Sequence, residues 1–289
     1  MNTAGDKTPG RLLQQVPVLQ RPKPGSWRSY RNLLFSCAAL GLVALSWETV
    51  ALLVTGLRGV PFPTPFETLL KLFAMLAGKP FLDHSIYSHI GTSLARWIGG
   101  FLLGGSGGAL LGMACGRWDA VERLFMPAIH ILQLIPGLAW IPVAILIFGL
   151  GDGATLFMIA VTALAPVAIN VAGGVKRVDE MYIRAAQMLG LNNRMLFLNV
   201  LLPGALPHIL SGLRIGLGNS WRVLVAAEMI VGSGTGLGYA IIQSRWTLDY
   251  AGAFVCIAVI CAIGLIVERL LFIPLEKRTV ELWGLKRES

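Results

Sequence analysis

The sequence of 289 residues is 55% apolar and only 13% charged, with a formal net charge of +9. So large an apolar share with so few charges excludes an ordinary soluble domain and indicates a protein that crosses a membrane several times. The apolar runs are too long and continuous for barrel strands, so we expect an all-α membrane protein. The net positive charge would also fit a nucleic-acid-binding protein, but Lys and Arg lie at the edges of the apolar runs, where orientation signals belong.

The amino-terminal segment, residues 1–31, combines several prolines with basic residues and has no apolar period, which predicts an irregular cytoplasmic tail. Residues 32–90 are expected to form a first transmembrane helix, about Leu33–Val54, and an amphipathic helix on the outer membrane surface. Residues 91–273 are expected to form the core of the helix bundle. Residues 274–289 are expected to form a second cytoplasmic tail.

The second span, about Ser93–Ala114, carries glycine at every fourth position, which marks a helix face where another helix backbone can approach closely. These packing glycines are Gly100, Gly104, Gly108, Gly112 and Gly116. The stretch around Ser106 formally matches the G-x-S-x-G of serine hydrolases. No strand precedes it and the glycine period explains the match, so we expect a packing role and no catalytic residue.

The third span, about Pro127–Leu150, is interrupted by Pro136-Gly137 and by Pro142, which predicts a helix that is kinked or opened midway. Broken membrane helices free backbone groups near the midplane and often line a solute path. Gln133 and Trp140 flank the interruption. We therefore expect these two side chains to line such a path.

The fourth and fifth spans, about Ala154–Val171 and Ile209–Val231, supply further candidates for the path. They are Asn170, Asn219, Arg222 and Glu228. An ionisable residue inside a membrane helix is costly unless it is paired or wet, so contact with the path and structural pairing both stay open for the charged residues. Arg222 and Glu228 do not share a helix face, so we do not expect them to pair with each other.

A glycine-rich stretch, residues 232–238, predicts a flexible outer loop, and the sixth span follows at about Ala251–Phe272. With six transmembrane helices, seventeen Lys and Arg fall on the side of the two termini and four on the other side. This asymmetry predicts that both termini and the polar segment 174–206 are cytoplasmic. The scattered cysteines and histidines have no ligand spacing, so no metal site is expected.

The polar segment 174–206 carries a family resemblance. Ala185-Ala186, then Gly190 four residues on, then nine residues to Val200-Leu201-Leu202-Pro203, resembles the cytoplasmic signature of permease subunits of bacterial ABC importers. Arg184 stands where the general pattern has Glu, and Val200 where it has Ile. The resemblance implies that this segment docks on an ATPase, through the residues Tyr182, Arg184, Ala185, Ala186, Leu189, Gly190 and Leu191.

Other stretches are similar to one branch of these permeases, which transports nitrate, taurine and alkanesulfonates. They are Pro136-Gly137-Leu138-Ala139-Trp140-Ile141-Pro142, Phe148-Gly149-Leu150-Gly151, Pro203-Gly204-Ala205-Leu206-Pro207, the Gly-rich run 212–218 and Val225-Ala226-Ala227-Glu228-Met229. The similarity implies a type I ABC importer permease architecture with a core like that of the methionine importer. It also implies a location in the bacterial inner membrane and a small anion as the transported solute. The translocation path is then formed by a homodimer of this subunit.

The resemblance implies as partners two copies of a cytoplasmic ATPase and a periplasmic or lipid-anchored solute-binding protein. No P-loop motif G-x-x-x-x-G-K-[ST] occurs in the chain, so we expect no cofactor here and place ATP and Mg on the partner ATPase. The alternative that the residues leave open is an ion-coupled secondary carrier that works without an ATPase. In either case the chain is expected to be a transport protein and not an enzyme.

Overall fold

The computed structural model describes residues 26–275, and the chain divides between residues 59 and 60 into two compact units. In the first unit, a single helix, α1 (Ser26–Arg58), has most of its apolar side chains exposed, as a span surrounded by lipid requires. The helix begins at Ser26, so the predicted boundary of the irregular tail at residue 31 is wrong. The remaining parts of the two predicted tails, 1–25 and 276–289, lie outside the described residues.

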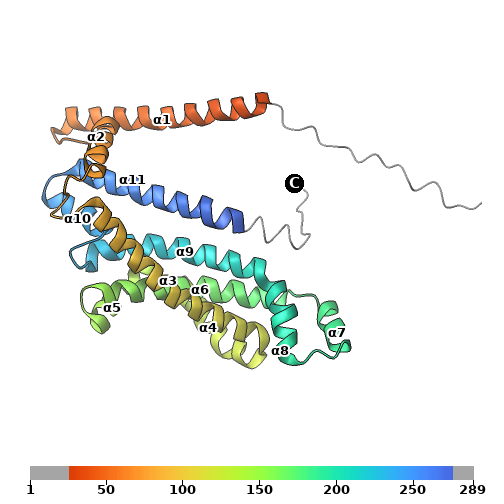
Figure 1. Cartoon of the computed structure of the whole chain (residues 1–289). Coiled ribbons are helices and arrows are strands. Elements are labelled where there is room, and N and C mark those ends of the chain that lie inside the picture. Colours follow the sequence, from red (N-terminus) through yellow and green to blue (C-terminus); the bar gives the residue numbers. More distant parts are fainter. Residues whose placement is uncertain (1–25, 276–289) are drawn as a thin grey trace, which may run out of the picture. The chain divides into compact units, whose positions relative to one another are not determined.

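The second unit is built around three long helices, α3 (Ile86–Arg117), α6 (Asp152–Lys176) and α9 (Leu202–Val231), with α6 packed between the other two (Figure 1). Shorter elements surround them. They are α2 (Pro65–Leu76), α4 (Asp119–Leu134), η1 (Gly137–Trp140), α5 (Ile141–Phe148), α7 (Glu180–Met188), α8 (Asn193–Leu196), η2 (Phe197–Leu201), α10 (Leu237–Trp246), α11 (Tyr250–Val267) and η3 (Glu268–Phe272).

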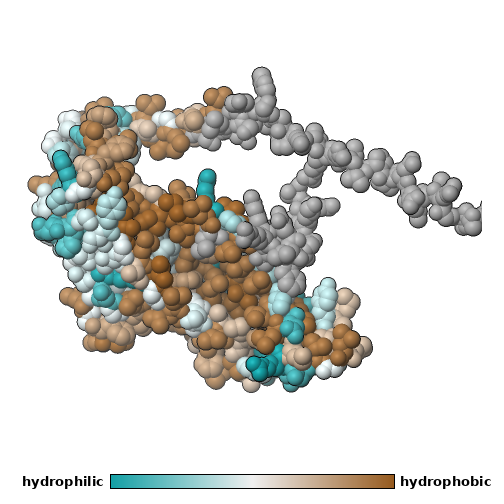
Figure 2. All heavy atoms as spheres, in the orientation of Figure 1, coloured by the Kyte–Doolittle hydropathy of each residue, from teal (hydrophilic) through white to brown (hydrophobic). Residues whose placement is uncertain are grey.

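Five helices of the described part are long and apolar enough to cross a membrane, and the bent pair α4 and η1–α5 makes a sixth span if it is counted as one. Between the two arms of this pair the helix direction turns by 103° at Ile135–Pro136. The predicted break in the third span is therefore confirmed, although α4 begins at Asp119, eight residues before the predicted start. Figure 2 shows hydrophobic side chains over much of the long-helix surface, with hydrophilic residues gathered mainly toward the two ends.

The glycine face of α3 packs directly on α6, as predicted. A Cβ atom built at Gly104 would lie 2.1 Å from the carbonyl oxygen of Ala160, and one at Gly108 would lie 2.5 Å from that of Leu164. Only glycine permits backbones this close. The hydroxyl of Ser106 bonds back to the carbonyl of Leu102 within the same helix, so the serine stands in a regular helix turn and not in a nucleophile elbow.

The predicted amphipathic segment forms α2 and belongs to the second unit rather than with the first span. The hydroxyl of Thr64 accepts from the backbone N–H of Glu67 at 3.2 Å and the Glu67 side chain accepts from the N–H of Thr64 at 3.0 Å, a capping box that starts the helix. Lys71 pairs with Asp249 at 2.7 Å, just before α11. The predicted grouping of residues 32–90 therefore divides at residues 59 and 60.

Candidate functional site

The predicted docking segment forms the exposed helix α7, which lies at the end of the second unit opposite α5 and α10 (Figure 1). The Asp179 carboxylate caps its first turn by accepting from the N–H of Met181 at 2.8 Å. Its last turn closes with two bonds, from the N–H of Gly190 to Gln187 and from the N–H of Leu191 to Ala186. This Schellman motif needs a left-handed residue, and Gly190 has a φ of 78°. The predicted bend at Gly190 is confirmed.

The surface of α7 presents large apolar side chains to its surroundings beside one ion pair. The exposed apolar residues are Met181, Tyr182, Met188 and Leu189, of which Met188 is 88% exposed. Arg184 pairs with Glu180 one turn before it, so its guanidinium already has an acidic partner within the helix. Exposed apolar side chains gathered on a water-facing helix are typical of a protein interface.

One predicted docking residue faces the other way. Ala186 is only 5% exposed, so its side chain is buried within this chain, where α7 packs on α8 and η2. The expectation that Ala186 offers its small side chain to a partner is therefore wrong in this structure.

The segment after Gly190 connects α7 to α9 through two short helical elements, α8 and η2. The Asn192 side chain caps α8 by accepting from the N–H of Met195 at 2.8 Å. A π-helical turn, η2, continues directly into α9, so that residues 193–231 are helical without a break in the chain. On the other side, α6 ends at Lys176, only four residues before α7 begins. Short connections therefore join α7 to both α6 and α9.

The broken span and α9 enclose a cavity of about 270 Å³. Four predicted path residues line it, namely Gln133, Trp140, Asn219 and Arg222. The lining also includes Thr162 on α6, whose buried hydroxyl has no partner in the described part of the chain. Sequence reasoning missed this residue, since an isolated Thr in an apolar span carries no distinguishing signal.

Close packing at η1 shapes this cavity. A Cβ atom built at Gly137 would lie 2.3 Å from a methyl group of Val223 on α9, so the backbone at Gly137, the first residue of η1, packs directly against that helix. The guanidinium of Arg222 donates to the side-chain oxygen of Asn219 at 3.3 Å, and Arg222 is exposed. As expected, Arg222 does not pair with Glu228. No carboxylate lines the cavity, whose single ionised side chain is therefore a cation.

The two remaining path candidates lie elsewhere. The side-chain amide of Asn170 donates to the carbonyl of Pro166 at 2.8 Å within α6. The side chain of Glu228 is 0% exposed and is held by α3, because Ser93 donates to it at 2.8 Å and Arg96 at 2.9 Å. Of the two possibilities left open for Glu228, the structure shows structural pairing.

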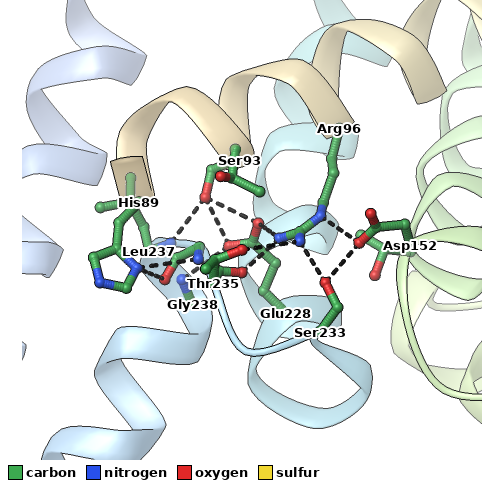
Figure 3. Close-up of polar contacts among 12 residues, drawn as sticks. His89, Ser93, Arg96, Asp152, Glu228, Ser233, Thr235, Leu237 and Gly238 are labelled. Atoms are coloured by element: carbon green, nitrogen blue, oxygen red, sulfur yellow. Dashed lines mark hydrogen bonds and ion pairs between the residues drawn. The ribbon is translucent and has the colours of Figure 1, made fainter. Parts of the chain in front are cut away.

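Figure 3 shows the polar network around Glu228, in which one arginine joins three parts of the second unit. The guanidinium of Arg96 donates to Asp152 at the start of α6 at 2.8 Å, and to the Ser233 hydroxyl and the Thr235 carbonyl at 2.6 Å each. The loop between α9 and α10 is thus pinned by hydrogen bonds, and the expectation of a flexible loop at 232–238 is wrong. From Leu237 onward this stretch is already helix α10.

Comparison with known proteins decides the family. The model of the family described as "Binding-protein-dependent transport system inner membrane component" matches residues 108–278 of this sequence. The chain belongs to this family. It is a transmembrane permease subunit of an ATP-driven importer, and not an enzyme or a secondary carrier. The matched region, residues 108–278, contains both the broken helix that lines the cavity and the exposed helix α7.

Curated relatives cover most of the chain. The taurine transport system permease protein TauC of Escherichia coli is 34% identical over 84% of this chain and 87% of its own length. The nitrate import permease protein NrtB of Synechocystis is 29% identical over 86% and 90%. The putative aliphatic sulfonates transport permease protein SsuC of Bacillus subtilis is 30% identical over 91% of both.

A solved structure shares the fold. It is an inward-facing form of the MetNI methionine ABC transporter, with a TM-score of 0.53 and 18% identity. The match covers 67% of this chain and 94% of the other. The predicted all-α architecture, with a core like that of the methionine importer, is confirmed.

Proposed function

We propose that this permease subunit imports a small anion such as nitrate, taurine or an alkanesulfonate across the bacterial inner membrane. Its relatives are named for taurine, nitrate and aliphatic sulfonates, which share an anionic oxygen group. The observation that carries the proposal is the cavity at the broken helix. It offers a guanidinium, the side chains of Gln133 and Asn219 and the Thr162 hydroxyl, with no carboxylate to repel an anion.

In this proposal two copies of the permease form the translocation path, and in each copy the cavity lined by Arg222 faces that path. Two copies of an ATPase bind ATP and Mg on the cytoplasmic side and dock on α7. A periplasmic or lipid-anchored binding protein delivers the solute from the other side. Closure of the ATPase pair moves α7, and the short connections to α6 and α9 carry that movement to the cavity.

The charge distribution supports the proposed orientation. The ends of α3 and α6 near α7 carry Arg117, Lys176 and Arg177, and Lys176 pairs with Glu122 at the start of α4. These cations gather at the α7 end of the bundle, which the positive-inside rule places in the cytoplasm together with both termini.

The direct test is ATP hydrolysis by the complete complex in liposomes, stimulated by candidate binding proteins loaded with nitrate, taurine or an alkanesulfonate. One loaded binding protein should raise hydrolysis and drive uptake of its anion. Arg222→Gln should lower uptake of that anion, whereas Arg245→Gln, on α10, should leave it unchanged. Uptake by the permease alone, without the ATPase, would contradict the proposal.

A control variant tests the docking part separately. Gly190→Trp puts a bulky side chain at a positive φ directly after α7, where space is open but the backbone conformation disfavours any side chain. The helices should still insert, because the spans are untouched, while hydrolysis should no longer drive uptake. Full coupling in this variant would refute the role assigned to the turn.

A further inference from the structure

A second groove is lined by residues of α3, α8 and η2. It has a volume of about 450 Å³ and runs between the last turns of α3 and the segment α8–η2. Its lining combines the apolar side chains of Leu110, Met113 and Phe197 with the two cations Arg117 and Arg194. None of the predicted path or docking residues lines it.

The two arginines of the groove have no ion pair or hydrogen bond through their side chains in the described residues. The first turn of α4 carries two acidic residues: Glu122 is already paired with Lys176, and Asp119 forms no ion pair with either arginine in the described residues. Two guanidinium groups thus face one groove without a counterion. Such a pair is a ready site for an anionic group, because guanidinium binds phosphate oxygens with two parallel hydrogen bonds.

The groove also has a defined depth in the membrane. Arg117 is the last residue of the candidate span α3, and Arg194 is the second residue of the candidate stretch 193–231, so each lies at the end of a helix apolar enough to cross a membrane. Trp118, which is 57% exposed, lies beside them, as is typical of a membrane interface. Leu110 is 65% exposed and lies two turns deeper, about 10 Å along α3.

Two cations at the ends of these helices and apolar side chains in the same groove match an amphiphile with a negatively charged head. We propose that the groove binds an anionic phospholipid, with its phosphate between Arg117 and Arg194 and an acyl chain along Leu110 and Met113. Basic pockets between membrane helices at the cytoplasmic face have this chemistry. The assignment to the inner leaflet rests on the proposed orientation of the chain, whereas the binding does not.

The position of the groove gives the lipid a consequence for transport. Arg194 and Phe197 belong to α8 and η2, the segment that joins α7 to α9. A phospholipid held there braces this segment against the end of α3. Anionic lipid in the bilayer should therefore raise hydrolysis coupled to uptake.

The test uses the complete complex with its ATPase, purified in mild detergent. Phosphatidylglycerol or phosphatidylcholine is added, and the lipid retained is measured by native mass spectrometry. The variant is Arg117→Gln with Arg194→Gln. The matched control is Arg123→Gln, which removes a cation from the same end of the bundle outside the groove. Assembly with the ATPase and helix content by circular dichroism show that each variant is folded.

The wild type and the control should retain phosphatidylglycerol in preference to phosphatidylcholine. Each Arg→Gln change should weaken retention by about fivefold, the usual effect of one charge at an anionic membrane surface. Equal retention of the two lipids, or of phosphatidylglycerol by the double variant and the wild type, would overturn the proposal. So would a photo-cross-linker at position 113 that reaches the ATPase or a second permease instead of lipid.

The result can be separated from that of the proposed function. Retention of phosphatidylglycerol needs neither substrate nor ATP hydrolysis. A complex that retains the lipid through its two arginines but is not stimulated by any loaded binding protein would support the lipid site and count against the proposed transport. A complex whose ATP hydrolysis is stimulated normally by a loaded binding protein but that shows no lipid preference would support the proposed transport and count against the lipid site.

Discussion

Replacing single glycines of α3 by alanine tests the packing of the bundle most sharply. At Gly104 the added methyl group would lie 2.1 Å from the carbonyl oxygen and 2.6 Å from the Cα atom of Ala160. At Gly107, on the same helix, the nearest atom would be a methyl carbon of Leu164 at 3.8 Å, an ordinary contact. The two variants therefore make the same chemical change in one helix, with and without a collision with backbone.

The size of the effect follows from these distances. Ordinary contacts between heavy atoms lie near 3.5 Å, so Gly104→Ala requires α3 and α6 to separate by about 1 Å along much of their length. Overpacking of this kind costs about 1–3 kcal/mol, more than the gain of about 1 kcal/mol in helix propensity. The difference between these two terms means that Gly104→Ala should lower the free energy of unfolding by up to about 2 kcal/mol. Gly107→Ala should leave that free energy unchanged or raise it by up to about 1 kcal/mol.

The assay is reversible unfolding of the detergent-solubilised chain by sodium dodecyl sulfate, followed by circular dichroism. Thermal unfolding of the same samples provides a check. Equal stability of the two variants would refute the argument that the glycine face sets the distance between α3 and α6. A loss at Gly107 as large as that at Gly104 would also refute it.

Two further variants test the site. Arg96→Leu leaves the fully buried Glu228 carboxylate without its cation, and breaking a buried pair costs about 3–5 kcal/mol, so the same unfolding assay should show a large loss of stability. A loss of stability below about 1 kcal/mol would show that the pair is not needed. Gly137→Ala places a methyl group 2.3 Å from Val223, so uptake should fall, and adding Val223→Ala should largely restore it. Uptake by the double variant no higher than by Gly137→Ala alone would contradict the contact.

The sequence predicted the features that depend on local pattern. The glycine period of α3, the break at Pro136-Gly137 and the turn at Gly190 each follow from the conformational rules of one or two residue types. Gln133 and Trp140 were predicted by their position beside the break, and the structure brings them together with Asn219 and Arg222.

Features that depend on distant partners could not be predicted in this way. Glu228 is 132 residues from Arg96 in the sequence, and nothing in its own helix shows that the carboxylate faces α3. The same arginine fixes the loop 232–236, whose glycine-rich composition indicated flexibility. Ala186 looked like an interface residue because small residues permit close approach, yet the neighbour that it approaches belongs to its own chain.

The central claim, that α7 receives the movement of an ATPase, is tested most directly by thiol labelling of Met188→Cys in the assembled complex. Met188 is 88% exposed in the chain alone, so a cysteine there should react rapidly with a maleimide without the ATPase and become protected when the ATPase is bound. Trp246→Cys, at the other end of the bundle and also exposed, serves as the control and should react equally in both states. Labelling of position 188 that is unaffected by the bound ATPase would contradict the account.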